Sequence, residues 1–410
     1  MKILMSAYSC EPNKGSEPSV GWNVVREAAK NHEVWVLTRP DESREAIEAE
    51  LARNPIPNLH FVYFTLPIGG GAWRLGQSGA MQIHYYLWQV QAYFVAKRLH
   101  REIGFDLIHH VTFGSFWCPS FLSLLPVPFV WGPVGGGESA PAPFWQDFSP
   151  RAKLYETLRS TACWVGGNDP FVRLTAQRSA TALVVSSDTY ARLSSLGATQ
   201  VDKIPGQTGI NEQELAELEK LIHKPTDTPV RFASIGRLLH WKGFHLGIRA
   251  FAEAKIDNSE YWVIGNGPER DRLENLAKEL GIAEKVQFFG AIPRTETLKA
   301  IGQCHVLVHP SLHDFSPTVC LEAMAAGCPV ICLNLGGPSV QITDDAGFRI
   351  AAEHPDQAVS DLAKAMIRLA GDPELRVSMG QAGNKLVHKY HTWQAKGELL
   401  GQIYQEAISK

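Results

Sequence analysis

The feature that most constrains the fold is a repeated alternation of short apolar runs with helical patterns along the 410 residues. Strand-like runs begin at residues 2–7 and recur up to 182–186, and the series restarts at 230–235 and ends at 329–333. A polar stretch around 223–228 separates the two series. Alternation of this kind predicts a parallel sheet covered by helices. Two consecutive series predict an α/β chain with two Rossmann-like domains.

The chain length supports the same division. A chain of 410 residues is too long for one ordinary hydrophobic core and suits two domains of about 200 residues each. In folds of this type, ligands bind at the carboxyl ends of the parallel strands. We therefore expect the carboxyl ends of both sheets to face a central cleft.

Composition argues against several classes of partner and location. A formal net charge of −3 gives no general attraction for nucleic acid. The seven cysteines form no paired CxxC clusters, which is typical of reduced core thiols in a cytosolic protein. No apolar stretch approaches the ~18 residues of a membrane-spanning helix, and the first apolar run is too short for a signal peptide. We therefore expect a cytoplasmic protein.

One segment bears on peripheral membrane contact. Residues 81–99 are rich in aromatic side chains, and Lys97, Arg98 and Arg101 lie at the end of this segment. One interpretation is a helix packed into the first domain. The other is a surface that meets a lipid-linked acceptor at the inner face of the membrane. Both interpretations remain open at this point.

The most informative stretch is residues 309–333, HPSLHDFSPTVCLEAMAAGCPVICL. A strand should end at His309, and a helix should begin near Thr318 with Glu322 in its first turns. The unpaired N–H groups and positive dipole end of such a helix suit a diphosphate. Asp314 lies before this turn, and Glu322, inside the helix, can accept hydrogen bonds from two ribose hydroxyls. The alternative is that Glu322 only caps its own helix.

The stretch 234–243, SIGRLLHWKG, runs from a strand into a loop. Arg237 and Lys242 lie on this loop, at the carboxyl end of a strand of the second sheet. Two fixed cations there can stabilise the negative charge that develops on a departing nucleoside diphosphate. The alternative is a pair of solvated surface cations, which is the usual fate of such residues. The position at a strand end favours the first interpretation.

The stretch 10–22, CEPNKGSEPSVGW, links the first strand to the first helix. Gly15 and Ser16 let the backbone approach a ligand at the mouth of the first domain. The sequence has no Walker A loop and no GxGxxG after the first strand, which argues against a dinucleotide, and we expect no cofactor. GNGP at 265–268 follows a strand but lacks a third glycine, so we interpret Gly265 as part of a turn near the cleft.

The sequence also lacks the usual ligands of a catalytic metal. It contains no Asp-x-Asp pair to hold Mg²⁺ or Mn²⁺ on a diphosphate, no HExxH and no clustered Cys/His ligands. We assign no residue to a metal. Arg237, Lys242 and the helix dipole would instead supply the positive charge that a metal supplies elsewhere.

Three motifs in order carry a family resemblance. Arg237 and Lys242 are followed by GNGPERDRL at 265–273, and then by Asp314 and Glu322 within DFSPTVCLEAMAAGCPV. Together they resemble the retaining glycosyltransferases of family 4, the group 1 glycosyltransferases, which share the GT-B fold. The resemblance covers the second domain well and the first domain loosely. The segments KGSEPSVGW and WGPVGGGE resemble a bacterial branch associated with surface polysaccharide assembly.

The resemblance implies roles for the matched side chains. Arg237 and Lys242 would bind the diphosphate of the donor. Glu322 would hold the donor ribose. Asp314 would contact hydroxyls of the transferred sugar near the reacting carbon.

The resemblance also implies contacts through the backbone. Thr318 and Val319 would offer their N–H groups to the phosphates. Ile292, just after FFGA, lies where the family's backbone contacts the nucleotide base. Gly15 would lie beneath the diphosphate and the acceptor.

Two positions depart from the family's pattern. The family usually has Glu at the first acid, and Asp314 is one methylene shorter, which bears on its reach to the sugar hydroxyls and on donor preference. Many members also place a His at the end of the strand that here reads PFVWGPVGGG, where this chain has Trp131-Gly132-Pro133. His109 and His110 end the neighbouring strand and are candidates to supply the imidazole. The alternative for each is a buried histidine bonded to backbone.

The C-terminal segment resembles the last helix of the family, whose end crosses back onto the first domain. We therefore expect residues 1–205 together with 386–410 to form the acceptor-side domain, and 206–385 to form the donor domain. A stripe of apolar side chains fits a final helix packed on another surface. The stripe consists of Trp393, Leu399, Leu400, Ile403 and Tyr404.

The resemblance implies a retaining, metal-independent glycosyltransferase that moves a hexosyl group from a nucleoside-diphosphate sugar to a hydroxyl of a glycan or lipid-linked acceptor. Its place would be in surface polysaccharide biosynthesis. No residue stands out as a covalent nucleophile, and in the family's usual account the leaving phosphate helps to deprotonate the acceptor. Two alternatives remain: a nucleotide-sugar epimerase of the same architecture, and a non-catalytic nucleotide-sugar binding protein.

Overall fold

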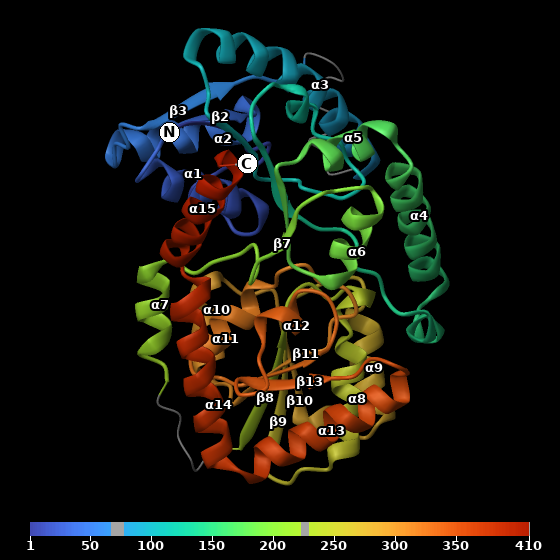
Figure 1. Ribbon diagram of the computed structural model, residues 1–410. Helices are drawn as coiled ribbons and strands as arrows, with labels where there is room; N and C mark the ends of the chain where they lie inside the picture. Colours follow the sequence, from blue (N-terminus) through green and yellow to red (C-terminus); the bar gives the residue numbers. More distant parts are fainter. Residues whose placement is uncertain (67–77, 223–228, 410) are drawn as a thin grey trace. The chain divides into compact units, whose positions relative to one another are not determined.

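The computed structural model describes residues 1–66, 78–222 and 229–409, and the polar stretch expected at 223–228 lies outside them. The chain forms two compact units (Figure 1). Unit 1 comprises Met1–Gly137, Leu158–Gln207 and Trp393–Lys410, and unit 2 comprises Glu138–Thr157 and Thr208–Thr392.

Unit 1 contains a parallel sheet whose described strands run in the order β3-β2-β1-β4-β5-β6-β7. The strands are β1 (Lys2–Ser6), β2 (Glu33–Thr38), β3 (Leu59–Tyr63), β4 (Leu107–His110), β5 (Phe129–Val134), β6 (Thr181–Val184) and β7 (Val201–Lys203). The expectation of a parallel sheet in the first half of the chain is confirmed.

Helices cover the sheet of unit 1. They are α1 (Glu17–Ala29), α2 (Pro40–Arg53), α3 (Ser78–Ile103), η2 (Phe121–Leu124), α4 (Pro150–Gly167, shared with unit 2), α5 (Pro170–Arg178), α6 (Ser187–Ser195) and α15 (Trp393–Ile408). The aromatic segment 81–99 lies within α3, where Trp88 and Ala96 face the core. Within the described residues, no helix is both long and apolar enough to cross a bilayer.

Unit 2 contains a second parallel sheet, with described strands in the order β10-β9-β8-β11-β12-β13. The strands are β8 (Val230–Ile235), β9 (Ser259–Ile264), β10 (Val286–Gly290), β11 (Val306–His309), β12 (Val330–Leu333) and β13 (Gly347–Ile350). The first five correspond to the runs expected from the sequence, and β13 was missed.

The helices of unit 2 precede β8, lie between its strands or follow β13 along the chain. They are η3 (Ala142–Asp147), α7 (Glu212–Glu219), η4 (His240–Lys242), α8 (Phe244–Ala254), α9 (Arg270–Glu279), η5 (Ala283–Lys285), α10 (Arg294–Gln303), α11 (Thr318–Ala325), α12 (Pro338–Gln341), α13 (Pro355–Gly371), α14 (Pro373–Leu386) and the π-helix η6 (Val387–His391). Helix α9 ends at Glu279, two residues before Gly281, which has φ of +69°.

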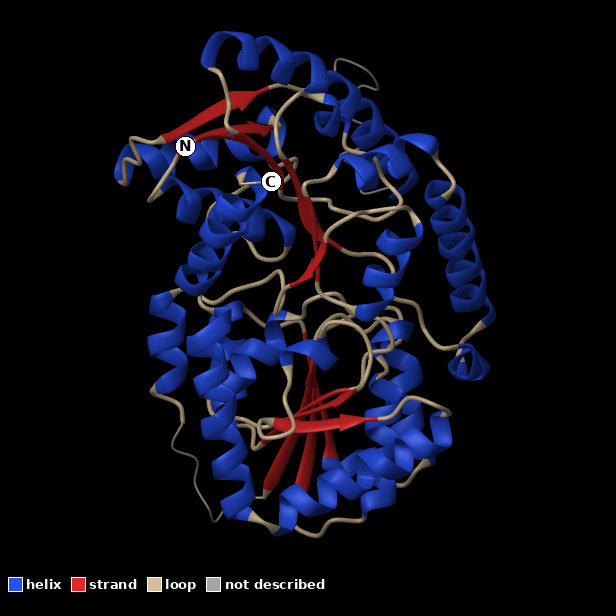
Figure 2. Ribbon diagram, in the orientation of Figure 1, coloured by secondary structure: helices blue, strands red, loops and turns tan. Residues whose placement is uncertain are grey.

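Each face of the unit 2 sheet has its own core, because successive side chains of a strand point to opposite faces. Phe232 and Val308 pack with α8 and α13, whereas Ala233 and Leu307 pack with α11. Figure 2 shows the strands of this unit enclosed by helices. Burial on both faces explains why these strands are continuous apolar runs in the sequence.

The boundaries of the two units differ from those expected from the sequence. The chain passes between units at Gln207 and again at Thr392, close to the expected 205 and 386, but residues 138–157 group with unit 2. Helix α15 belongs to unit 1, where Tyr404 is fully buried and its hydroxyl contacts His109.

Helix α15 also buries a lysine. Nζ of Lys396 donates to the carbonyl of Gly206 at 2.5 Å, and burial lowers the pKa of Lys396 to about 7. In the unfolded chain the pKa returns to its ordinary value of ~10.4. Between these two values the unfolded chain holds a proton that the native chain does not. The free energy of unfolding should therefore fall as the pH drops from 10 toward 7.

The Lys396→Met variant should lose this pH dependence. Urea unfolding of both proteins at several pH values from 7 to 10 gives the difference in unfolding free energy. We expect the free energy of unfolding of wild type, relative to that of the variant, to rise with pH by at most ~1.4 kcal/mol per pH unit, since one proton is involved. Parallel pH profiles would show that Lys396 stays charged in the native protein.

Candidate active site

Two loops of unit 2 meet at the carboxyl edge of its sheet. β8 and β11 are neighbours, so the loops that follow them emerge side by side. The amide of Leu312 in the second loop donates to the carbonyl of Trp241 in the first at 2.8 Å. Gly243, with φ of +67°, makes a close approach, because a Cβ there would lie 1.9 Å from the carbonyl oxygen of Pro310. The two loops are therefore joined along their backbones.

An ion pair joins the same two loops. Nζ of Lys242 lies 2.6 Å from Oδ2 of Asp314, and Nε2 of His309 donates to this oxygen at 2.9 Å. The two paired side chains are only 19% and 16% exposed. Burial alone would raise the pKa of Asp314, but the charge of Lys242 and the His309 hydrogen bond outweigh it and hold the pKa well below its usual range. Asp314 is therefore a carboxylate at neutral pH.

The other predicted residues of unit 2 lie on the same edge. Arg237 follows β8 and is exposed, and its side chain makes no hydrogen bond or ion pair with the described residues. Gly265, with φ of +134°, follows β9, and a Cβ there would lie 1.9 Å from the carbonyl oxygen of Gly236. Ile292 follows β10 and is partly buried. The loops after four neighbouring strands thus carry the candidates that the sequence indicated.

Helix α11 begins at Thr318, as expected. The N-cap residue of the described helix, Pro317, accepts no hydrogen bond with its side chain. The first N–H groups of the helix, which include those of Thr318 and Val319, therefore receive no side-chain cap from this residue. This positive helix end follows the loop of Asp314 directly. An anion placed there would meet both backbone N–H groups and the helix dipole.

Glu322 lies one turn into α11 with its side chain 4% exposed. Nη1 of Arg294 donates to Oε1 of Glu322 at 2.6 Å, and Nη2 of the same guanidinium lies 3.2 Å from Glu214. Burial raises the pKa of Glu322, and the charge of Arg294 offsets part of this rise. Sequence reasoning missed Arg294. It follows β10, and a cation after a parallel strand was the signal that identified Arg237.

His109 and His110 lie at the end of β4 and are buried in unit 1. Nε2 of His109 donates to the carbonyl of Gly132 at 2.6 Å, and Nδ1 accepts from the hydroxyl of Tyr404 at 2.7 Å. Both ring nitrogens of His110 contact buried hydroxyls, at 2.9 and 3.0 Å. Burial lowers the pKa of His109 to about 4 and that of His110 to about 3. These contacts favour the interpretation of two neutral core histidines over a catalytic role.

Gly15 and Ser16 lie between β1 and α1 in unit 1. Gly15 is exposed, and a Cβ built there would have no atom within 4 Å, so packing does not require a glycine. Ser16 has φ of 62°, which is uncommon outside glycine. The next residue, Glu17, accepts a hydrogen bond from the amide of Phe113 at 2.6 Å. This bond ties the loop to the turn after β4.

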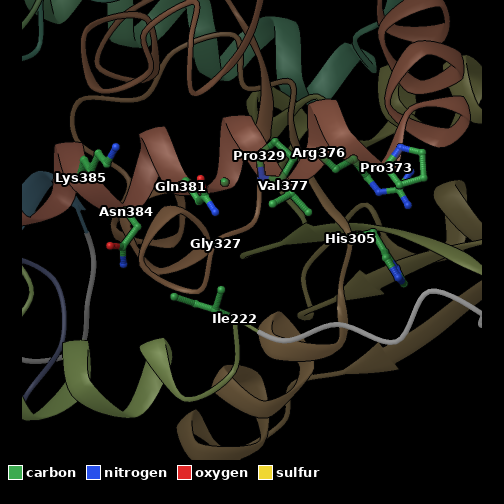
Figure 3. Close-up of a pocket in the computed structure, with 11 residues that line it drawn as sticks. Ile222, His305, Gly327, Pro329, Pro373, Arg376, Val377, Gln381, Asn384 and Lys385 are labelled. Carbon is green, nitrogen blue, oxygen red and sulfur yellow. The ribbon is translucent and has the colours of Figure 1, made fainter.

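A separate pocket of about 250 Å³ lies elsewhere in unit 2 (Figure 3). Its lining includes His305 and Pro329, which immediately precede β11 and β12, together with Arg376 and Asn384 of α14. The pocket is therefore at the amino ends of these strands. The loops of Lys242 and Asp314 leave the opposite ends, so this pocket is not part of the candidate active site.

The family whose model matches is described as "Glycosyl transferases group 1", and the match covers residues 217–386. This region is similar to the domain that defines the group 1 glycosyltransferases. It contains all the candidate residues of unit 2. The recognition made from Arg237, Lys242, Asp314 and Glu322 is confirmed.

Curated relatives agree with this assignment. Two lipopolysaccharide core biosynthesis glycosyltransferases of Rhizobium meliloti are each 30% identical to this chain. The match to LpsD covers 46% of this chain and 53% of LpsD. The match to LpsE covers 53% of this chain and 58% of LpsE. The chain thus spans about half the length of these two relatives. The 2-deoxystreptamine N-acetyl-D-glucosaminyltransferase of Streptomyces fradiae is 26% identical over 73% of this chain and 68% of its own length.

Solved structures share the fold at low sequence identity. The lipopolysaccharide outer core galactosyltransferase WaaB has a TM-score of 0.65 at 14% identity, with 99% of this chain and 100% of that chain covered. Sucrose-phosphate synthase from Thermosynechococcus elongatus has a TM-score of 0.62 at 20% identity, with 100% and 99% covered. HepE of Anabaena, in complex with UDP and glucose, has a TM-score of 0.59 at 16% identity, with 99% of each chain covered. The GT-B fold is confirmed.

The expected role of Arg237 and Lys242 on the donor diphosphate can be measured. Arg237→Ala or Lys242→Ala should lower turnover of a sugar donor by ~10²-fold or more, the usual loss when a group that stabilises transition-state charge is removed. Lys278→Ala is a matched control, because Lys278 is an exposed cation of the same unit on α9. Steady-state rates and melting temperatures of the three variants are compared with wild type. Near-normal rates in both site variants would contradict the diphosphate assignment.

Proposed function

We propose that the protein transfers a hexosyl group from a nucleoside-diphosphate sugar to a hydroxyl of a glycan or lipid-linked acceptor, with retention of configuration and without a metal ion. The observation that carries the proposal is the ion pair between Lys242 and Asp314 beside the N-terminus of α11. A lysine ammonium and a carboxylate on adjoining loops support a cation for the phosphate beside an acceptor for sugar hydroxyls.

The donor fits the carboxyl edge of unit 2. Its diphosphate is an anion, and Arg237, Lys242 and the N–H groups of Thr318 and Val319 supply positive groups. Glu322 lies further along the same helix and can accept hydrogen bonds from ribose hydroxyls. HepE has been solved with UDP and with UDP-glucose, which supports a nucleoside diphosphate as the ligand here.

The reaction breaks the bond between the anomeric carbon and the diphosphate oxygen. A new bond forms from an acceptor hydroxyl to the same carbon on the same face, and the hydroxyl proton passes to the leaving phosphate. Negative charge grows on the diphosphate as its bond breaks, so groups fixed around it stabilise the transition state more than the ground state. Asp314, ionised and held by two partners, would fix the sugar by accepting hydrogen bonds from its hydroxyls.

The acceptor proposal draws on unit 1. Ile83, Leu87 and Phe94 of α3 are 67%, 41% and 64% exposed, and their spacing places them on one face of the helix. Arg98 and Arg101 continue this face and are exposed. An apolar stripe that ends in cations suits the surface of a membrane with anionic lipids. Together with the lipopolysaccharide core enzymes among the relatives, it supports an acceptor for a surface polysaccharide.

Retention of activity in excess EDTA tests the proposed independence from metal. Among the described residues, no group of three or more His, Cys, Asp or Glu side chains is placed to hold an ion. A thermal-shift screen with UDP, GDP, ADP and their sugars selects the donor, since a ligand bound by the native state raises the melting temperature. Release of the diphosphate from this donor should require an acceptor and should be unchanged by EDTA. If EDTA abolishes the activity and Mg²⁺ or Mn²⁺ restores it, metal independence is refuted. Turnover of the donor without an acceptor would favour the epimerase.

The two acids should separate in binding experiments. Glu322→Gln should weaken the binding of the free nucleoside diphosphate and of the whole donor alike, because both ligands contain the ribose. Asp314→Asn should leave diphosphate affinity nearly intact and still lower turnover. A hydrogen bond to a charged group contributes about 1.5–3 kcal/mol, so each loss should be roughly tenfold or more. Calorimetry of both variants with both ligands decides the matter. If both variants bind the free diphosphate equally more weakly than wild type, Asp314 supports the phosphate loop instead of the sugar.

A further inference from the structure

Helix α4 (Pro150–Gly167) buries a carboxylate that neither the sequence motifs nor the proposed reaction uses. Its buried residues are Ala152 and Glu156, and Glu156 is only 1% exposed. Residues 138–157, which include Glu156, belong to unit 2. Burying a carboxylate costs several kcal/mol unless partners compensate for its lost hydration. The partners of Glu156 therefore indicate what this arrangement achieves.

One oxygen of Glu156 joins the two loops of the candidate active site. Nε2 of His240 lies 2.9 Å from Oε1 of Glu156, and Nε2 of His313 lies 3.1 Å from the same oxygen. His240 is on the loop after β8 and His313 is on the loop after β11. The two histidines are distant from Glu156 in the sequence, so only the folded chain brings the three together.

Aromatic rings reinforce this junction. The ring of Trp241 stacks with those of His313 and Tyr155, at centroid distances of 5.2 and 5.3 Å and with interplanar angles of 17° and 12°. Phe148 contacts the His240 ring edge-on at 4.9 Å. These rings fix the two imidazoles in orientation, because stacked and edge-on aromatic contacts are directional.

Each histidine is close in sequence to a residue of the proposed donor site. His240 precedes Lys242 by two positions, and His313 immediately precedes Asp314. The loops are thus held together at Glu156 on one side and by the Lys242–Asp314 ion pair on the other. A shift of either histidine would move the backbone that carries the cation or the acid.

We propose that Glu156 is a positioning residue that holds Lys242 and Asp314 in the geometry needed by a donor diphosphate sugar. Its catalytic consequence rests on the proposed function, whereas its effect on the two loops does not. Glu156 touches neither substrate nor reacting atoms and acts through His240 and His313.

The experiment combines hydrogen exchange with kinetics. Glu156→Ala should speed amide exchange in 237–243 and in 311–316 together, and should lower kcat by ~10- to ~100-fold, since small displacements of catalytic groups have effects of this size. Glu156→Gln should lose less in both measurements, because its amide oxygen can still accept from one imidazole. In the double variant Glu156→Ala/His313→Ala, the fold-loss in kcat should be smaller than the product of the losses in the two single variants, because both substitutions remove the same contact.

Glu27→Gln is the matched control. Glu27 is also a buried carboxylate, on α1 of unit 1, and pairs with Arg26 and Lys30. Its loss should lower the melting temperature and leave exchange in 237–243 and 311–316 unchanged. Unchanged exchange in both segments of Glu156→Ala would overturn the inference, as would wild-type kcat in that variant. If the segments loosen but wild type itself transfers no sugar, the positioning role stands and the proposed function fails.

Discussion

The candidate site depends on the adjacency of β8 and β11 in a parallel sheet. Because these neighbours end at the same edge, the loops after them meet, and Lys242 can lie 2.6 Å from Asp314 although the two are 72 positions apart. The pair is largely buried, so its attraction is less screened than that of a surface pair. Strand order thus creates the local charge arrangement on which the proposed chemistry is built.

The environments of the two acids separate their behaviour. Asp314 has a lysine and a histidine on one oxygen, which keeps it ionised despite burial. In the described ranges, the cation that is hydrogen-bonded to Glu322 is Arg294, and burial raises the pKa of Glu322. An acid that remains charged suits sugar hydroxyls near a reacting carbon. A buried acid within a helix suits the fixed part of the donor, whose position does not change during the reaction.

Local patterns predicted the two sheets and the start of α11, because buried parallel strands are apolar runs in the sequence. They also predicted that the candidate residues of unit 2 lie on loops that follow strands, and the structure has them there. β13 was missed because Arg349 interrupts its four residues. Arg294 was missed although, like Arg237, it follows a parallel strand. Glu156 was missed because its partners His240 and His313 are 84 and 157 positions away in the sequence. The roles of His109 and His110 also depended on tertiary burial, which the sequence pattern does not specify.

A crystal structure with the nucleoside diphosphate that gives the largest thermal shift tests the central claim most directly. We expect the diphosphate within hydrogen-bonding distance of Lys242 and of the N–H groups of Thr318 and Val319. We also expect the ribose beside Glu322. A diphosphate bound elsewhere, or one that leaves Lys242 paired only with Asp314, would contradict the assignment of this edge of unit 2 as the donor site.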